Sequence, residues 1–448
     1  MKIQLSDHFT YKKLIRFTLP SIGMMIFSSI YGVVDGFFVS NFAGETEFTA
    51  VNFIMPFLMI LGAIGFMFGA GGSALIAKTL GEGDRDKANR LFSLLVYVSI
   101  IVGAVITVVG LVCLRPIATL MGAEGQMLEN CVAYGRIIAL GLVFFMMQME
   151  FQSFMITAEK PQLSLVFTVA AGVTNIVLDA LFVAVLDFGL EGAAIATVTS
   201  QFVGFACPFI YFSRKNSSLL RLGRATFDFG ALVKACTNGS SELMTNISMS
   251  LVGMLYNTQL LEYANQQGVA AYGVLMYVNF IFISVFIGYS IGCAPIIGYH
   301  YGAGNSQELK GLLRKSSVII LVSSVCMVGL SIVLSVPMAE LFVGYNPSLF
   351  ELTKRAFLFY SFSFLFSGFA IFGSSFFTAL NNGPVSAIIS FLRTLVFQTA
   401  AVIALPLIFE SLGGLGSDGI WLSIVVAEAL AVVVTFIFIV AKRKKYNY

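Results

Sequence analysis

Charged side chains are scarce in this chain. Its 448 residues include 26 Lys and Arg and 23 Asp and Glu, so 11% are charged, against about a quarter in a soluble globular protein. Hydrophobic residues make up 58%, and the mean hydropathy is +0.91. This balance excludes an ordinary soluble domain and leaves no basic surface for nucleic acid. We therefore expect a polytopic membrane protein.

Histidine and cysteine are also few. The two histidines are too far apart to indicate a metal site, and no CxxC pair appears among the six cysteines. We interpret the cysteines as small apolar core residues, although Cys113 and Cys131 flank one predicted outer loop. The sequence lacks a His/Glu metal set, a Ser–Lys pair and a nucleophile motif. We expect neither an enzyme nor a bound cofactor.

Long apolar segments dominate instead. Twelve of them reach the ~20 residues that cross a bilayer. The basic residues collect in alternate loops, and the positive-inside rule then places both termini in the cytoplasm of a multi-pass cell-membrane protein. The first segment is too long for a signal peptide, so we expect it to stay uncleaved. The spans are 14–39, 50–77, 91–114, 131–157, 162–186, 192–212, 231–260, 269–298, 316–337, 354–380, 384–409 and 418–441.

The two halves of the chain repeat each other. Residues 75–91 recur as 296–312, and 154–161 as 376–384. Each half has six spans and enters the membrane in the same direction, which predicts parallel repeats with the ligand site between them. The fold class is thus all-α, with an N-terminal lobe (1–212), a cytoplasmic linker (213–230) and a C-terminal lobe (231–448).

Glycines mark two further features of the repeat. The GEGD and GAGN segments resemble nucleotide-binding loops only superficially, because no strand precedes them; we interpret them as cytoplasmic turns with helix caps. The pairs Gly65–Gly69 and Gly288–Gly292 have the GxxxG spacing that is typical of closely packed membrane helices.

Burying an acidic side chain inside a membrane span costs free energy, so each acid in the spans is a candidate functional residue. Asp35 and Asp179 lie about four and about seven residues from the outer ends of their spans, at ~1.5 Å per residue. Asn175 precedes Asp179 by one helical turn, and Tyr134 and Thr197 lie at a similar depth. We predict that these five side chains form one network that holds a proton or a cation. The alternative is that each acid locks helices locally, but a neutral Asn does that at a lower desolvation cost.

The remaining acids suggest a substrate cavity. Glu242 begins a polar stripe that includes Asn246 and Tyr256, and Glu150 lies beside Met147 in a cluster of Phe and Met. Such a wall suits flat, cationic, apolar molecules through cation–π and sulfur contacts. Structural pairing of these acids is the alternative. We interpret Arg393 and Glu428, near the middle of the last two spans, as a structural ion pair.

Three segments carry a resemblance to a known family. They are PSIGMMIFSSIYGVVDGFFVS, AVNFIMP followed by the GEGD loop, and NIVLDALFV. Together they resemble the multidrug and toxic compound extrusion (MATE) family over essentially the whole chain, most of all its bacterial MepA-like branch. The resemblance implies a V-shaped pair of six-helix bundles that exports cationic drugs in exchange for H⁺ or Na⁺.

The resemblance also implies roles for single residues. The family's ion-coupling positions correspond to Asp35, Asn175 and Asp179, with Tyr134 and Thr197 beside them. Pro20 resembles the proline at which the family's first helix bends. Some relatives hold sodium in the second lobe through acids on spans 7 and 10; here span 10 offers only serines, so proton coupling is favoured over sodium.

The leading hypothesis is a monomeric antiporter for xenobiotic export by alternating access, as in antibiotic resistance. A lipid-linked precursor flippase of the same superfamily is the alternative. It would favour a strongly basic central cavity, whereas Arg393 is the one cation in the middle of a span.

Overall fold

The computed structural model describes residues 3–39, 42 and 45–448, and every regular element among them is helical. The all-α prediction is confirmed. The first half holds α1 (Tyr11–Phe38), α2 (Glu45–Gly81), α3 (Arg85–Leu120), α4 (Gly125–Thr157), α5 (Pro161–Asp179), the π-helical turn η2 (Ala180–Val185) and α6 (Gly189–Ser213). The second half holds α7 (Phe229–Gly302), α8 (Ser306–Val343), α9 (Pro347–Ser361), α10 (Phe364–Ala379), α11 (Gly383–Phe391), the π-helical turn η3 (Leu392–Phe397), α12 (Gln398–Ser411) and α13 (Gly416–Tyr446).

These helices account for twelve membrane crossings. Ten helical segments of the described chain are long and apolar enough to span, and α9 with α10 forms another span bent by 47°. The 74 residues of α7 would extend about 110 Å as one straight rod, far beyond a bilayer. Asn265 interrupts α7 with φ 53° and ψ −158°, which lies outside the helical region. The chain reverses there, so α7 contains two spans.

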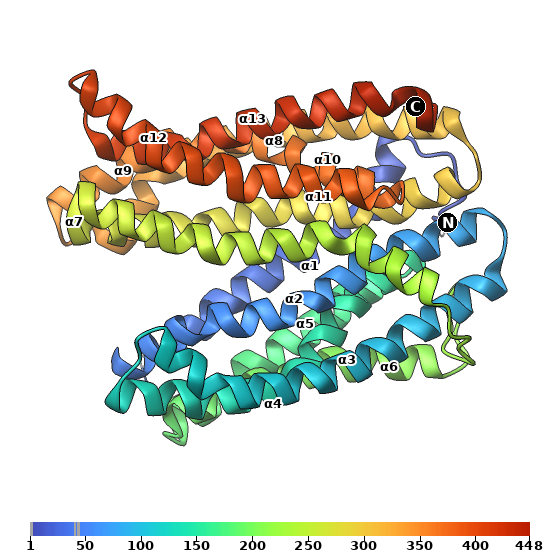
Figure 1. Cartoon of the computed structure of the whole chain (residues 1–448), viewed down its shortest axis with the longest axis horizontal. Coiled ribbons are helices and arrows are strands. Elements are labelled where there is room, and N and C mark those ends of the chain that lie inside the picture. Colours follow the sequence, from blue (N-terminus) through green and yellow to red (C-terminus); the bar gives the residue numbers. More distant parts are fainter. Residues whose placement is uncertain (1–2, 40–41, 43–44) are drawn as a thin grey trace.

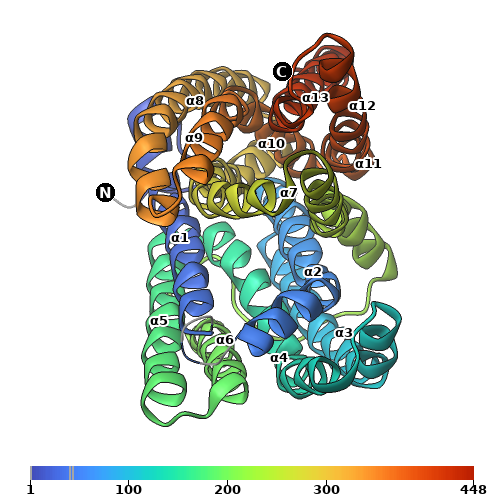
Figure 2. The ribbon, with the colours of Figure 1, turned by 90° about the vertical axis from the view of Figure 1, so that its left-hand side faces the viewer.

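The helices form two bundles that follow the sequence halves. In Figure 1, α1–α6 lie below and α7–α13 above, and both termini are at the right-hand end. The end-on view of Figure 2 separates the same two groups. We call them the N-lobe and the C-lobe. Termini at one end agree with an even number of crossings.

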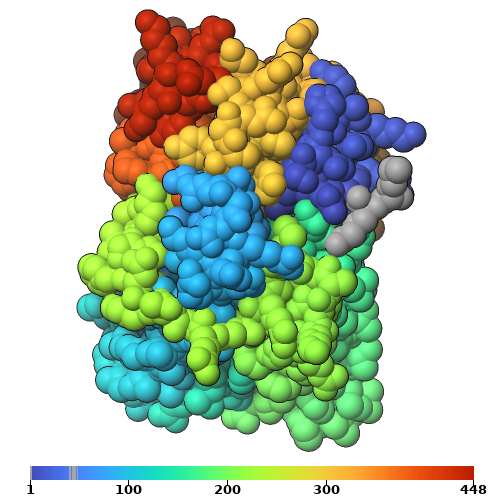
Figure 3. Space-filling view, turned by 90° about the vertical axis from the view of Figure 1, so that its right-hand side faces the viewer, coloured from blue at the N-terminus to red at the C-terminus, as the bar shows by residue number. Residues whose placement is uncertain are grey.

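The lobes are joined mainly at the end that carries the termini. One core cluster there combines N-lobe residues such as Phe17 and Ile156 with C-lobe residues such as Tyr289 and Phe376. At the far end each lobe has its own cluster, around Tyr134 in one and Trp421 in the other. Figure 3 views the joined end, where the turn after α2 (light blue) lies between the C-lobe and the linker.

Glycines allow backbone to touch backbone across this junction. A Cβ on Gly71 of α2 would overlap the Ala235 carbonyl oxygen of α7, and one on Gly288 would lie 2.6 Å from the Ile22 Cα of α1. The GxxxG predictions are confirmed, since a Cβ on Gly65 would lie 2.6 Å from the Met146 Cα of α4. One glycine pair packs α2 within its lobe, and the other packs α7 against the opposite lobe.

The predicted caps are also present. The Asp84 side chain accepts from Lys87 N at 2.9 Å, and Asn305 accepts from Glu308 N at 3.0 Å. Both start the helix that follows a glycine-rich turn, as expected of Asx caps. All six cysteines are free; Cys131 is buried, whereas Cys326 is exposed.

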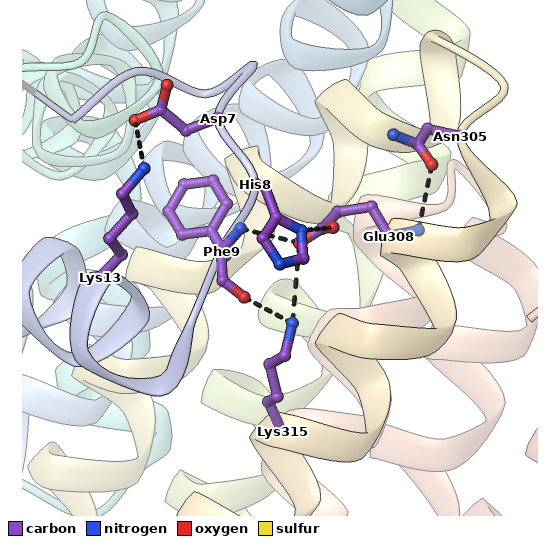
Figure 4. A network of polar contacts seen from close by, with 7 residues as sticks. All are labelled: Asp7, His8, Phe9, Lys13, Asn305, Glu308 and Lys315. Atoms are coloured by element: carbon purple, nitrogen blue, oxygen red, sulfur yellow. Dashed lines mark hydrogen bonds and ion pairs between the residues drawn. The ribbon is translucent and has the colours of Figure 1, made fainter.

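A segment before α1 ties the two lobes together at the junction. We call residues 3–10 the N-terminal latch. Leu5 and Phe9 are fully buried. The Leu5 amide donates to Glu159 of the N-lobe at 2.8 Å, and the Phe9 amide donates to Glu308 of the C-lobe at 2.9 Å. Figure 4 shows Glu308 also paired with His8, with 2.6 Å between Nδ1 and Oε2.

Candidate coupling site

The candidate site is built around Asp35, three residues before the end of α1. Thr197 Oγ1 of α6 donates to Asp35 Oδ1 at 3.3 Å. The same carboxylate faces the Asp179 carboxylate and the Asn175 amide of α5. Helices α5 and α6 are thus brought to α1 by polar side chains in an otherwise apolar region.

Asp179 ends α5 and is fully buried. The next six residues form the π-helical turn η2, and single π turns inside helices are frequent at functional sites. Neither carboxylate oxygen of Asp179 has a hydrogen-bond donor among the described residues. Because two carboxylates offer only acceptors, a hydrogen bond between Asp35 and Asp179 requires a proton on one of them.

Tyr134 of α4 completes the cluster. Its ring is buried, and it lies close enough to both carboxylates to interact with them electrostatically. Its hydroxyl points to Met55 Sδ at 3.9 Å. The structure therefore brings together all five residues that we had grouped by their depth along the spans. Their role in coupling stays a prediction. Oxygen and amide groups of this kind can hold a proton or a hard cation.

Tyr31 belongs to the same neighbourhood and was missed from the sequence. It lies one helical turn before Asp35, with its hydroxyl facing Gln148 of α4. Its ring packs on Gly172 of α5, where an added Cβ would lie 2.8 Å from Tyr31 Cδ1. The i−4 spacing from Asp35 was the available signal.

Glu150 and Met147 lie inside the N-lobe, both with 0% exposure. The Glu150 carboxylate faces Ser99 of α3, and neither of its oxygens has a hydrogen-bond partner in the part of the chain that the structure describes. The structure thus places these two residues in the core of one lobe, apart from the other predicted cavity residues of α7.

The other predicted cavity residues, Glu242, Asn246 and Tyr256, lie along the first span of α7. Asn246 Nδ2 donates to the Glu242 carbonyl at 2.8 Å. The Tyr256 hydroxyl lies 2.7 Å from Ser423 Oγ, and its ring stacks on Tyr272 at 5.4 Å. Tyr256 and Ser423 thus form a neutral hydroxyl pair within the C-lobe.

The predicted ion pair is confirmed. Arg393 Nε donates to both Glu428 oxygens, at 2.8 and 3.0 Å, with Glu428 2% exposed. Arg393 is the second residue of η3 and also interacts electrostatically with Glu242. Pro20, the predicted bend, lies inside α1, which runs without interruption from Tyr11 to Phe38. No three His, Cys, Asp or Glu side chains gather as a metal site within the described ranges.

Known proteins match this chain over nearly its whole length. The family model described as MatE matches residues 20–181 and 243–402. The chain is 24% identical to the multidrug export protein MepA of Staphylococcus saprophyticus, over 97% of this chain and 94% of the relative. It is 25% identical to the MepA of Staphylococcus haemolyticus, with the same coverage.

Solved structures share the fold. A MATE crystallised in complex with MaL6 superposes with a TM-score of 0.92, at 23% identity and 98% coverage of both chains. An outward-facing multidrug resistance MATE transporter of the MOP superfamily gives a TM-score of 0.91, at 23% identity and with 98% of this chain and 97% of that chain covered. With a family model that matches both halves and a two-lobed fold shared end to end, the chain belongs to the MatE family.

Proposed function

We propose that this protein is a secondary antiporter that exports cationic, apolar compounds in exchange for H⁺. The observation that carries the proposal is the Asp35–Asp179 pair, two facing carboxylates at one site within the N-lobe. A charge buried at membrane depth is costly, so the pair gains most by keeping one proton. Loss and gain of a second proton then switches its charge.

Membership of the MatE family and the MepA relatives, named multidrug export proteins, support the substrate class. Glu242 and Asn246 on α7, with the stacked Tyr256 and Tyr272 rings further along the same element, supply the chemistry for a flat cation. Met147 and Glu150 contribute from within the N-lobe if the lobe repacks. The transport cycle needs no cofactor beyond the coupling ion, with Na⁺ as the alternative ion.

The arrangement of the lobes supports alternating access in a monomer. They are joined at the end with the termini and have separate cores at the other end. The positive-inside rule, applied to the basic loops, places the joined end on the cytoplasmic side of the cell membrane. Protonation of the carboxyl pair would let the outer part of the N-lobe repack and release substrate outward.

The test is ethidium transport in inverted vesicles, driven separately by a pH gradient and by a sodium gradient. We expect the pH gradient to drive transport and Asp35→Asn to abolish it, while the variant still inserts and folds. Unchanged proton-driven transport by Asp35→Asn would overturn the proposal. Transport driven by sodium alone would replace H⁺ by Na⁺ as the coupling ion.

The lipid-linked flippase gains no support from the geometry. A pyrophosphate-binding cavity needs free positive charge, and Arg393, a cation near the middle of a C-lobe span, is neutralised by Glu428 at 2.8 Å.

A further inference from the structure

A line of buried polar residues runs along one face of α5. Ser164, Thr168, Asn175 and Asp179 are each at most 3% exposed. Their spacings of four, seven and four residues place them on the same side of the helix. From Ser164, one turn after the start of α5 at the joined end, the line extends about 22 Å to the carboxyl pair.

Two glutamines of α4 face this line. Gln152 Nε2 donates to Thr168 Oγ1 at 3.3 Å, and Ser164 Oγ donates to the Gln152 carbonyl at 3.2 Å. Gln148, one turn earlier, packs over Gly204 of α6, where an added Cβ would lie 2.6 Å from Gln148 Cδ. Its amide faces the Tyr31 hydroxyl, and the Tyr31 ring packs on Gly172, which lies between Thr168 and Asn175 along α5.

A small pocket opens among these groups. Its polar lining comes from Gln148, Gln152, Ser164 and Thr168. Phe151, Met155, Phe167, Gly204 and Pro208 form the rest of its wall. The pocket has room for about one water molecule, and four polar side chains exceed the two partners that a buried water needs. A purely apolar packing role would not require four polar groups at one buried point.

We propose that this line is a proton relay that joins the Asp35–Asp179 pair to the cytoplasmic end of the N-lobe through a water in the pocket. The relay rests on the proposed antiport. Each transfer breaks one O–H bond and forms another, at Tyr31, the pocket water, Thr168 and Ser164 in turn. The net result is a proton that leaves a carboxylic acid and enters cytoplasmic water. Gln148 and Gln152 position the water by their amides and do not themselves carry the proton.

A proton relay changes the rate of transport but not the equilibrium protonation of the carboxyl pair. A rate measurement together with an equilibrium measurement therefore distinguishes the role of the relay from that of the pair. For Thr168→Val, which removes a proton carrier, we expect pH-driven ethidium transport to slow about 100-fold, the lower end of what a positioned proton-transfer group contributes. Gln148→Leu removes an amide that positions the water, and we expect a smaller loss of rate from it. The pH dependence of equilibrium ethidium binding should stay that of the unmodified protein. Thr168→Ser, which keeps the hydroxyl, should restore most of the rate.

Thr174→Val is the matched control, because Thr174 lies on the same helix and, among the described residues, its side chain bonds only the Ala170 carbonyl, at 2.8 Å. Equilibrium ethidium binding reports that each variant is folded. Transport at the unmodified rate by both relay variants would overturn the relay, as would equal losses in Thr168→Val and Thr174→Val. If the unmodified protein shows no pH-driven transport, or Asp35→Asn keeps it, the antiport proposal fails and takes the relay with it.

Discussion

At the scale of single residues, this protein buries acids in two different ways. Glu428 is neutralised by Arg393, whose Nε contacts both carboxylate oxygens. Asp179 faces another carboxylate and has no donor within the described residues. Both sites adjoin a π-helical turn, η2 after Asp179 and η3 around Arg393. The ion pair suits a fixed structure, whereas the carboxyl pair suits a change of protonation.

The ion pair gives a stability prediction. Glu428→Gln leaves the part-buried Arg393 without its hydrogen-bonded counter-charge, so we expect a loss of about 3–5 kcal/mol in the free energy of unfolding. Replacing both partners, as Arg393→Met with Glu428→Leu, should recover most of that loss because neither member of the pair is left without the other. Thermal unfolding of the purified protein measures both. Equal destabilisation by the single and the double variant would contradict a structural ion pair.

At the scale of the helices, contact between the lobes depends on glycine. Gly239 of α7 lies so close to α2 that an added Cβ would overlap the Met67 carbonyl oxygen, and Gly71 meets Ala235 in the same way. Backbone cannot yield as a side-chain tip can, so the two helices must separate to admit even a methyl group. The closed junction between the lobes therefore depends on these positions.

Gly239→Ala tests this dependence. We expect the variant to lower the thermal stability of the protein, because α2 and α7 can no longer touch. Gly253→Ala is the matched control on the same helix, since no atom of the described residues lies within 4 Å of an added Cβ there. The control should be neutral or more stable, by about 0.5–1 kcal/mol, the helix propensity gained. The idea fails if both variants unfold at the same temperature.

Pro20 adds a prediction about α1. Proline inside a helix removes one backbone hydrogen bond and costs about 3 kcal/mol, yet α1 continues through it. Pro20→Ala should stabilise the uninterrupted helix, raise the unfolding temperature and slow ethidium transport if the cycle bends α1. Leu19→Ala, at an exposed neighbour, is the control. Normal transport by Pro20→Ala would show that the cycle does not need a bend at this residue.

At the scale of the whole molecule, the N-terminal latch connects parts of the chain that are about 150 and 300 residues away from it in sequence. Glu308 accepts from the Phe9 amide and pairs with His8, while Lys315 donates to the Phe9 carbonyl (Figure 4). The latch can persist only while the two lobes keep this junction closed, because Glu159 and Glu308 belong to different lobes.

Removing the Glu308 carboxylate should release the latch. We expect Glu308→Ala to speed tryptic cleavage after Lys12 and Lys13, because residues 3–10 no longer hold the start of α1 against α8. Limited digestion of vesicles with this end exposed, followed by mass measurement of the N-terminus, gives the rate. Gln307→Ala changes the exposed neighbour and should leave cleavage unaltered. Equal rates in both variants would show that the latch does not depend on Glu308.

Much of this architecture was predictable because it depends on short stretches of sequence. Hydropathy located twelve crossings, Asp84 and Asn305 indicated the caps, and glycine spacing indicated the close packing at Gly65 and Gly288. Depth along each span grouped Asp35 with Asp179, since rise per residue is nearly constant in a helix. What each of those acids faces across the lobe was not available from depth alone.

The sequence by itself determined the number of spans, their repeat and the depth of each polar residue, because these follow from length, hydropathy and helical rise. Only the tertiary structure decided which helix faces which. It placed Tyr31 and Gln148 between the carboxyl pair and the pocket, buried Glu150 inside the N-lobe, and brought Glu308 to the N-terminal latch. The rotation of a helix about its axis depends on the side chains of its neighbours, and those neighbours are distant in the chain.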